Sequence, residues 1–400
     1  MTSPNVYFGS INHGKIAQFA SLANKLELII DSLDFSTLKK NDKVAVKMHL
    51  GYTDGAQTIP SFYVKRVVER IKKTGAYPFI TDTPTSVYNA ADRGYTQETC
   101  GCPIIPISGI KERYGYKTEI NYRNIETMNM AGVLHDSDAL VNLSHVKAQN
   151  NVGYAAAIKN LGVGGYNGSD RWHQIHGIFN SVPSFYPEKC TPAHAEELVK
   201  SCPYGYIKYH KEKHELDINR GRCYNGNCFE CLKADVDIGC LNMEPETFQT
   251  FQELITISSK KILERYDECK VFHINFLMDI TPTCDCMGVI QPQIIPDIGI
   301  AGSRDIVAVE AASIDLVSKE ELIWRKVPPY FKHLNVDPSI KLHPFQRLWG
   351  PLKDPYNMVK FGVKYGLGQN PYELIEILPA AETLDMEGRN VFERGQPSFA

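Results

Sequence analysis

The sequence predicts an α/β protein: a mainly parallel sheet with helices on both faces, carrying a cysteine-rich insert. Short β-branched runs alternate with helical patterns in the first third of the chain, and a strand–turn–helix pattern returns near residues 297–317. Between them lies RCYNGNCFECLKADVDIGC (residues 222–240), which holds four of the eleven cysteines. A sheet interrupted by a cysteine-rich segment is therefore the starting expectation.

The first third of the chain supplies the β-α-β order. VAVKMHL (44–50) is an apolar, β-branched run that predicts a strand. Residues 60–75 place apolar side chains at helical i, i+3, i+4, i+7 spacing, with proline at the start and glycine at the end. YPFITDT (77–83) is the next strand. A helical crossover between consecutive strands predicts that they run parallel.

Later segments extend the same pattern. We expect strands at GCPIIPIS and ALVNLSHV, a helix between glycine loops at GYAAAIKNLGVGG (153–165), a long amphipathic helix at PETFQTFQELITISSKKILERY (245–266) and a buried strand at KVFHINFLMDI. DIGIAGSRDIVAVEAASIDLV reads as strand, turn and helix, with Ser303 or Asp305 as the cap. One more helix is expected near PYNMVKFGVKYG.

Four segments follow from this reading. Residues 1–186 and 244–325 form the two parts of the α/β core, 187–243 form the insert, and 326–400 form a C-terminal helical extension and tail. Within the insert we expect a short helix capped by Thr191 and an exposed hairpin at YIKYHKEKHELDI. Few large aliphatic residues occur there, so the insert is expected to need a metal or another covalent staple to fold.

Composition excludes several classes of function. The 43 basic and 46 acidic residues nearly balance, which argues against a nucleic-acid partner. No apolar run approaches the length of a membrane span, and the N-terminus does not read as a secretory signal, so a cytoplasmic protein without a membrane partner is expected. The expected partners are a small-molecule substrate, an electron-transfer protein and a second copy of the chain.

The insert cysteines predict a metal centre. In two-cluster ferredoxins, the fourth cysteine of each C-x2-C-x2-C-x3-C-P run ligates the cluster of the other run. A lone Cys-Pro followed, after a spacer, by a cysteine triplet therefore predicts one [4Fe–4S] cluster, with the ligands Cys202, Cys223, Cys228 and Cys231. Cys240 is left over as the last cysteine of the second run. Four thiolates could equally hold structural Zn²⁺, or the cysteines could be buried thiols without metal.

A second cysteine pair lies in FLMDITPTCDCMG, just past the C-terminal end of a predicted strand. Ligands bind at that edge of open parallel sheets. Cys284 and Cys286 could share a metal there, or meet the cluster of the insert, with Asp279 and Asp285 close by in sequence. The alternative is a loop with two inert thiols.

Polar residues end other predicted strands. Lys47 and His49 share one face of the first strand, and a lysine inside an apolar run needs a partner. Asn142 and His145 end a later strand, and Lys159 follows among alanines, which let a ligand approach and favour the neutral, nucleophilic amine. We expect these five residues to line a substrate pocket. The alternative to a pocket role is that Lys47 extends its amine to solvent and that Lys159 is an ordinary surface lysine.

These segments resemble the DUF362 family, a domain of unknown function. The matching pieces are VKMHLG, TIPSFYVKRVV…PFITDT, LVNLSHVK…GYAAAIKNLGVGG and FLMDITPTCDCMG…IIPDIGIAGSRDIVAVEAASIDLV, which span most of residues 43–318. Members often carry a ferredoxin-like insert with complete cysteine runs, whereas this insert retains one cluster's worth of cysteines. The resemblance implies iron–sulfur binding and leaves the reaction open.

Three hypotheses follow. The first is an iron–sulfur redox enzyme acting on a small molecule in the strand-end pocket. The second is a metal- or cofactor-dependent isomerase or lyase that uses Lys159 and His145 as acid and base. It draws on a fainter resemblance to nickel-pincer lactate racemases, in which a histidine precedes a G-Y-x-x-A-x-K-like stretch. The third is a non-catalytic electron carrier.

Overall fold

A computed structural model describes residues 3–178, 183–219, 230–243, 246–329, 331 and 341–386, so Cys223 and Cys228 lie outside the described residues. Its centre is an eight-stranded sheet in the order β16-β1-β15-β14-β7-β2-β3-β4. Only β15 runs antiparallel to its neighbours in this sheet. The strands are β1 (Asn5–Ser10), β2 (Lys43–Lys47), β3 (Tyr77–Asp82), β4 (Ile104–Pro106), β7 (Ala139–His145), β14 (Val271–Leu277), β15 (Gly299–Ser303) and β16 (Glu373–Glu376).

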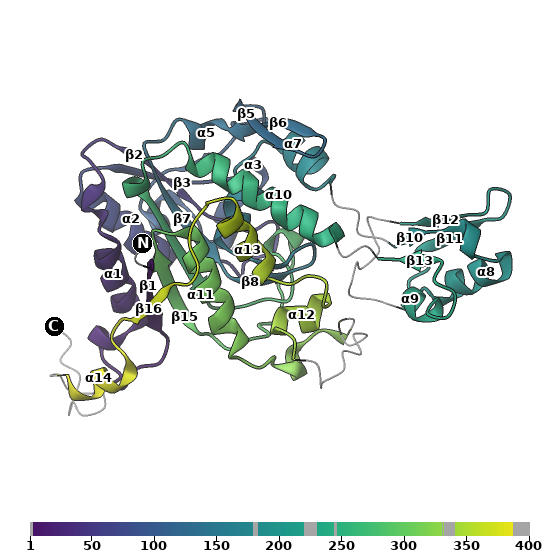
Figure 1. The fold of residues 1–400 in the computed structure, drawn as a ribbon. Coiled ribbons are helices and arrows are strands. Elements are labelled where there is room, and N and C mark those ends of the chain that lie inside the picture. Colours follow the sequence, from purple (N-terminus) through teal and green to yellow (C-terminus); the bar gives the residue numbers. More distant parts are fainter. Residues whose placement is uncertain are drawn as a thin grey trace.

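Helices cover both faces of this sheet, as the sequence predicts (Figure 1). Because side chains alternate along a strand, neighbouring residues enter different cores. Val141 packs with one set of helices and Leu140 with the other. The first set is α1 (Leu22–Leu33) and α2 (Ser61–Lys73); the second is α6 (Ala157–Gly162), α10 (Glu246–Leu263), α11 (Ile306–Ser318) and α13 (Tyr356–Lys364). Every residue of β7 and β14 is buried, which is typical of parallel strands covered on both sides.

Most predicted elements are present, and one cap is now assigned. Asp305 accepts hydrogen bonds from the backbone N–H groups of Val307 and Ala308, so it caps α11. The side chain of Ser303 instead donates to the carbonyl of Asn5 on β1. Thr191 caps α8 (Pro192–Ser201), as expected.

Two parts of the core differ from the prediction. The helix expected from residue 153 begins only at α6, because Gly153–Ala155 (β9) pairs with Lys147–Gln149 (β8). Gly153 has φ +80°, and a Cβ there would meet the backbone carbonyl of Lys353. The hairpin of β5 (Gly115–Tyr122) and β6 (Ile125–Ala131) was not predicted, since its strands alternate polar and apolar residues only weakly.

The insert forms a small body of its own beside the core (Figure 1). At its base β10 (Ser184–Phe185) pairs with β13 (Leu241–Asn242), and β11 (Ile207–His210) forms a hairpin with β12 (Glu215–Ile218). Its small core draws on α8, and α9 (Glu230–Ala234) packs against α8. Because two of its cysteines lie outside the described residues, the ferredoxin-like pattern stays a prediction.

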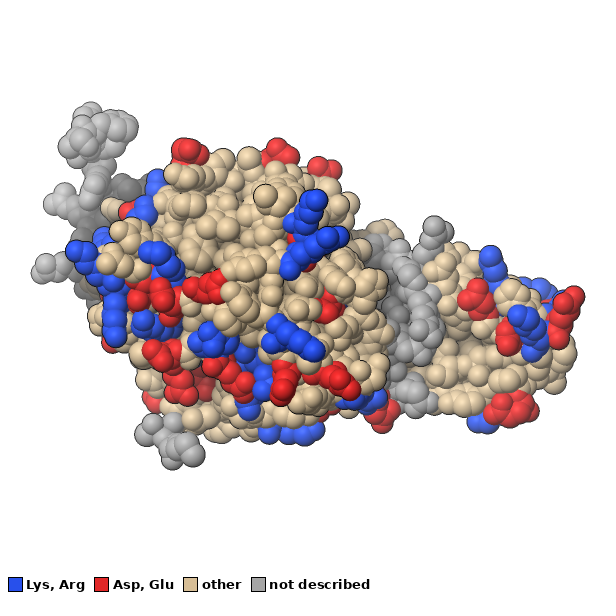
Figure 2. Space-filling view, turned by 90° about the horizontal axis from the view of Figure 1, so that it is seen from above, with Lys and Arg blue, Asp and Glu red and all other residues tan. Residues whose placement is uncertain are grey.

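The surface carries charges of both signs. Figure 2 shows Lys and Arg side chains interspersed with Asp and Glu over the described residues of one face of the core, as expected from the near balance of charges. In the described part of the chain, no helix combines the length and the apolar character needed to cross a membrane.

Candidate functional site

A cavity of about 640 Å³ opens at the C-terminal ends of the parallel strands. β2, β3 and β7 end at Lys47, Asp82 and His145, so their last side chains reach the same edge of the sheet. The walls are completed by α6, by residues 284–287 and by a π-helical turn at Arg171–Ile175. The cavity therefore lies where the sequence predicts a substrate pocket, and it collects four of the five predicted residues: Lys47, His49, His145 and Lys159.

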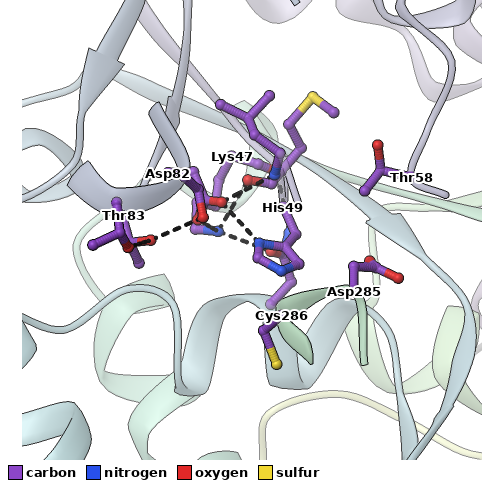
Figure 3. A network of polar contacts seen from close by, with 12 residues as sticks. Lys47, His49, Thr58, Asp82, Thr83, Asp285 and Cys286 are labelled. Carbon is purple, nitrogen blue, oxygen red and sulfur yellow. Dashed lines mark hydrogen bonds and ion pairs between the residues drawn. The ribbon is translucent and has the colours of Figure 1, made fainter. Parts of the chain in front are cut away.

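Asp82 joins the first two of these residues (Figure 3). Lys47 Nζ lies 3.1 Å from Asp82 Oδ1, and His49 Nδ1 lies 2.9 Å from Oδ2, which also accepts the N–H of Leu50. Burial opposes ionisation of the carboxyl, but Lys47 and His49 outweigh it and hold the pKa of Asp82 well below its usual range. Burial lowers the pKa of Lys47, and Asp82 offsets part of that effect.

The sequence analysis did not single out Asp82. The residue ends β3 just as Lys47 ends β2, and the two positions lie at the same edge of neighbouring parallel strands. Applying the strand-end rule to YPFITD would have found it.

Asn142 is the predicted pocket residue that does not line the cavity. It is fully buried below the cavity, where its side-chain amide donates to the carbonyl of Ala157. Its oxygen accepts from Asn160 Nδ2 at 2.7 Å, and Asn160 Oδ1 in turn accepts from Lys47 Nζ at 2.9 Å. Asn142 therefore holds α6 and Asn160 in place, and Asn160 is the side chain that reaches the lysine.

A second buried carboxylate, Asp285, lies between the two cysteines that line the cavity. It contacts His145 Nδ1 at 3.1 Å and forms an ion pair with Lys147. Burial opposes its ionisation, but Lys147 and His145 hold the pKa of Asp285 below its usual range. His145 Nε2 lies 2.8 Å from the carbonyl oxygen of Met278, so both ring nitrogens of this histidine already have partners. Asp279 does not line the cavity.

Cys284 and Cys286 also line the cavity. Cys284 is 3 % exposed, whereas Cys286 is exposed. A hydrogen bond from the Cys286 thiol, together with Lys159, His49 and Lys147, lowers the pKa of Cys284 well below the ordinary thiol value. The same shared hydrogen bond raises the pKa of Cys286. The shared hydrogen bond thus favours the thiolate form at Cys284 and the thiol form at Cys286.

Two cations lie against this thiolate. Lys159 Nζ is 3.9 Å from Cys284 Sγ. The second ring nitrogen of His49, Nε2, is buried and has no hydrogen-bond partner among the described residues. Burial opposes the charged ring, but Asp82 and Cys284 raise the pKa of His49. Cys284, His49 and Asp82 all line this cavity, and they are residue types that serve as nucleophile, acid/base and orienting carboxylate.

Arg171 adds a further positive charge to the wall. It is 7 % exposed, and Nη2 lies 3.0 Å from Glu112 Oε2. Nη1 is buried and has no hydrogen-bond partner among the described residues. A buried donor without a partner is costly, so the cavity is suited to a ligand that brings an anionic oxygen to this nitrogen.

An aromatic pair forms the adjacent wall. Trp172 stacks on His176 with a ring-centre distance of 5.2 Å. Burial, with Lys159 and Arg171, lowers the pKa of His176 to about 4. His173 does not line the cavity, so the two histidines spaced i, i+3 do not converge on it.

Metal-ligating side chains gather in the insert. Among the described residues, His194, Asp235 and Cys240 are the one group with three such atoms within 4.8 Å of one another. Cys202 and Cys231 are half-buried against the core of the insert, and the N–H of Tyr206 donates to Cys202 Sγ at 3.2 Å. None of the described insert residues lines the cavity.

Comparison with known families and structures adds a relationship over most of the chain. A family model described as "Domain of unknown function (DUF362)" matches residues 44–315, which confirms the resemblance drawn from the strand-end motifs. No curated protein matches.

Similarity to solved structures is distant. The lactate racemase apoprotein from Thermoanaerobacterium thermosaccharolyticum is 10% identical, with a TM-score of 0.34, over 80% of this chain and 62% of that one. A protein from Thermotoga maritima is 9% identical, with a TM-score of 0.30, over 66% and 51% of the two chains. The chain thus spans about half to three fifths of the length of these structures, and similarity at this level assigns no function.

Proposed function

The chain belongs to the DUF362 family, whose description assigns no reaction, and we propose from its own cavity that it is an enzyme that uses a cysteine thiolate on a small anionic molecule. One observation carries the proposal: the nearly buried sulfur of Cys284 lines the same cavity as Lys159 and His49 and lies 3.9 Å from the amine of Lys159, and these neighbours lower the pKa of its thiol. A thiolate is the reactive form of cysteine, and a neighbouring acid/base group completes the activation.

The roles of the surrounding residues follow from their contacts. His49 can deliver a proton to a leaving group, since Asp82 holds the ring by its other nitrogen and favours its charged form. The positive charge of Lys47 balances the negative charge of Asp82, so the buried carboxylate can stay ionised. His145 and Lys147 hold Asp285, which fixes the loop between the two cysteines.

The substrate class is inferred from the charges on the wall. Lys159 and Lys147 are near Cys284, and Arg171 offers a buried N–H without a protein acceptor. A carboxylate or phosphate group would complete the hydrogen bonding of Arg171 and place the rest of a small molecule near the sulfur. The exposed ring of Trp172 offers an apolar surface to that molecule.

The two thiols suit a two-electron step. The Cys284 thiolate would form a bond to an oxidised, electrophilic atom of the substrate. Cys286 would then attack the Cys284 sulfur, which forms the disulfide and breaks the bond to the substrate; the product leaves with the electron pair and takes up one proton from the Cys286 thiol and one from His49. The substrate gains two electrons and the dithiol loses them. An electron-transfer protein or an iron–sulfur cluster must then return two electrons to the disulfide. Under this scheme, non-reducing peptide mapping of substrate-treated protein should show a peptide with Cys284 and Cys286 joined.

We propose the insert as the place for that cluster. Cys202 and Cys231 fit the role: they lie on one small core, and a backbone N–H points at the Cys202 sulfur, as hydrogen bonds to cluster sulfurs do. Cys223 and Cys228 would complete the ligand set, and bound in this way the cluster would supply one-electron transfer. Anaerobically purified protein should then be brown, with about four iron atoms per chain. Colourless protein with one zinc per chain would instead support a structural Zn²⁺ site.

Alkylation with a charged and a neutral reagent tests the cavity. Iodoacetate carries a carboxylate, whereas iodoacetamide does not, and Cys269 is an exposed thiol near the opposite end of β14 that serves as an internal control. Relative to Cys269, Cys284 should favour iodoacetate, and Arg171→Gln should reduce that preference about tenfold, the value of one charge-assisted hydrogen bond. Because Arg304 lies beside Cys269, the deciding comparison is between variants: an iodoacetate preference at Cys284 that Arg171→Gln leaves unchanged would contradict the anion-binding cavity.

The isomerase or lyase hypothesis stays a second candidate, because the amine of Lys159 lines the same cavity. The two schemes differ in which variant loses turnover. Thiolate chemistry requires Cys284, so Cys284→Ser should abolish it while Lys159→Arg retains part of it. Acid–base chemistry at Lys159 predicts the reverse order.

A further inference from the structure

The insert contains a second cluster of metal-ligating side chains, separate from the predicted iron–sulfur ligands. His194 lies in the first turn of α8, Asp235 directly follows α9, and Cys240 precedes β13. All three are buried, and their ligand atoms lie within 4.8 Å of one another. Cys190 is also buried and lies in the same small core of the insert as Cys240.

We propose that Cys190, His194, Asp235 and Cys240 bind one divalent zinc-class ion in a tetrahedral site that fastens the two halves of the insert together. Two thiolates, an imidazole and a carboxylate are all zinc ligands. The residues come from both ends of the insert, so one ion joins α8 to the segment that leads into β13. Because the apolar core of the insert is small, the insert needs such a cross-link to be stable.

The geometry leaves room for one ion and not for a four-iron cluster. His194 Nε2 and Cys240 Sγ lie 2.8 and 2.9 Å from the same oxygen, Oδ1 of Asp235. Ligands of a tetrahedral Zn²⁺ are about 3.3–3.8 Å apart, as bond lengths of about 2.0–2.3 Å require. A small widening of these contacts therefore admits one ion, whose bonds replace the two hydrogen bonds to Oδ1.

The surroundings already hold these ligands in a suitable state. The backbone N–H of Leu241 donates to Asp235 Oδ2, which leaves Oδ1 for the metal. His194 Nδ1 lies 3.2 Å from Glu197 Oε2, the outer carboxylate that commonly holds a metal-bound histidine. On binding, the two thiols release their protons, and the neutral ring of His194 keeps its proton on Nδ1, facing Glu197.

The two-run logic of the cysteines supports the same assignment. If the last cysteine of the first run, Cys202, serves the second run, then Cys240, the last of the second, should serve the first. The first run retains Cys190 and His194, and the structure places Cys240 near His194 and in the same small core as Cys190. The proposed single-ion site therefore occupies the place that one of the two clusters would occupy in a two-cluster ferredoxin.

Titration of the full-length, metal-stripped chain with Co²⁺ and with Zn²⁺ tests the site. We expect one Co²⁺ per chain with the intense visible bands of a tetrahedral, thiolate-ligated ion, displaced by one Zn²⁺. Cys240→Ser should weaken binding at least about tenfold, whereas Cys202→Ser should leave it unchanged. Cys202→Ser also removes a predicted ligand of the iron–sulfur cluster, so Co²⁺ binding is measured on protein that contains no iron.

A further pair of variants separates ligation from hydrogen bonding. His194→Gln keeps an N–H donor toward Asp235 but ligates poorly, so it should retain the circular dichroism of the wild type and lose stoichiometric cobalt. Asp235→Cys should keep a tetrahedral spectrum with stronger sulfur-to-cobalt absorption. The proposal is overturned if the wild type binds no stoichiometric ion, if its cobalt is octahedral, if Cys202→Ser abolishes binding, or if His194→Gln binds as the wild type does.

Discussion

Asp82 Oδ2 lies 2.9 Å from Nδ1 of His49, a residue 33 positions earlier that follows the neighbouring strand. The other carboxylate oxygen contacts the buried amine of Lys47, so one side chain serves two cations. This bridge holds the ring of His49 by one nitrogen, leaves the buried Nε2 without a hydrogen-bond partner among the described residues, and places all three side chains on the wall of the cavity.

Removing the charge of Asp82 should destabilise the fold. Asp82→Asn leaves Lys47, which is 1 % exposed, without a carboxylate. Breaking one partner of a buried ion pair costs about 3–5 kcal/mol, and we expect a loss of that order in the free energy of unfolding by urea. Lys72→Ala, which removes the exposed pair with Glu69, is the control and should cost less than about 1 kcal/mol. Equal effects of the two changes would show that Lys47 does not depend on Asp82.

The pH dependence of Cys284 alkylation should report its neighbours. Because His49 and Lys159 lower the pKa of Cys284, alkylation in the wild type should reach its plateau at a lower pH than for an ordinary thiol. His49→Gln and Lys159→Ala should each move the inflection to higher pH, since each removes a positive charge that stabilises the thiolate. His173→Gln, a histidine off the cavity, is the control. An inflection that is the same in all four proteins would argue against the thiolate.

Stability should fall between about pH 4.5 and 7 because of Glu310. This side chain is fully buried in α11, and burial raises its pKa to about 7, although Oε1 accepts the N–H of Ile158. The folded state holds this proton over a range where the unfolded state has lost it, so the contribution is complete below the unfolded pKa and is lost as pH rises through 7. The loss is on the order of 3 kcal/mol.

Glu310→Gln provides the comparison. Glutamine keeps an oxygen for Ile158 but does not titrate, so the difference between unfolding free energies at pH 5 and pH 8 should shrink in the variant. Relative to the wild type, the variant should therefore be more stable at pH 8 than at pH 5. If Glu310→Gln has the same pH dependence of stability as the wild type, a group other than Glu310 causes that dependence.

Asp305 should matter for the helix that backs the sheet. It caps α11 through two N–H groups, and Oδ2 accepts the N–H of Gln369 in the C-terminal segment. Asp305→Ala should lower the free energy of unfolding by about 1–2 kcal/mol, whereas Asp305→Asn, which retains cap geometry, should recover most of it. Hydrogen exchange of the Val307 and Ala308 amides gives the local readout, and unchanged protection in the alanine variant would contradict the cap.

Local pattern alone located much of this protein. Alternation and helical spacing identified β2, α2, β3, α10, β14 and α11, because these depend on residues close in sequence. The strand-end rule brought Lys47, His49 and His145 to one edge, since parallel strands share their C-terminal side.

The tertiary structure decided which of these side chains meet. Cys284 lies 235 positions after His49, and their contact depends on strand order and on the path of the loop after β14, which no short-range pattern specifies. Asn142 is paired in register with Lys47 but does not line the cavity, because its shorter side chain is taken up by Ala157 and Asn160 of α6. The reversal of β15 and the meeting of His194 with Cys240 likewise arise from long-range packing. The sequence by itself determined which reactive side chains the chain carries and at which edge of the sheet they lie. Only the tertiary structure determined which of them contact each other, because such a contact requires two segments far apart in sequence to come within bonding distance.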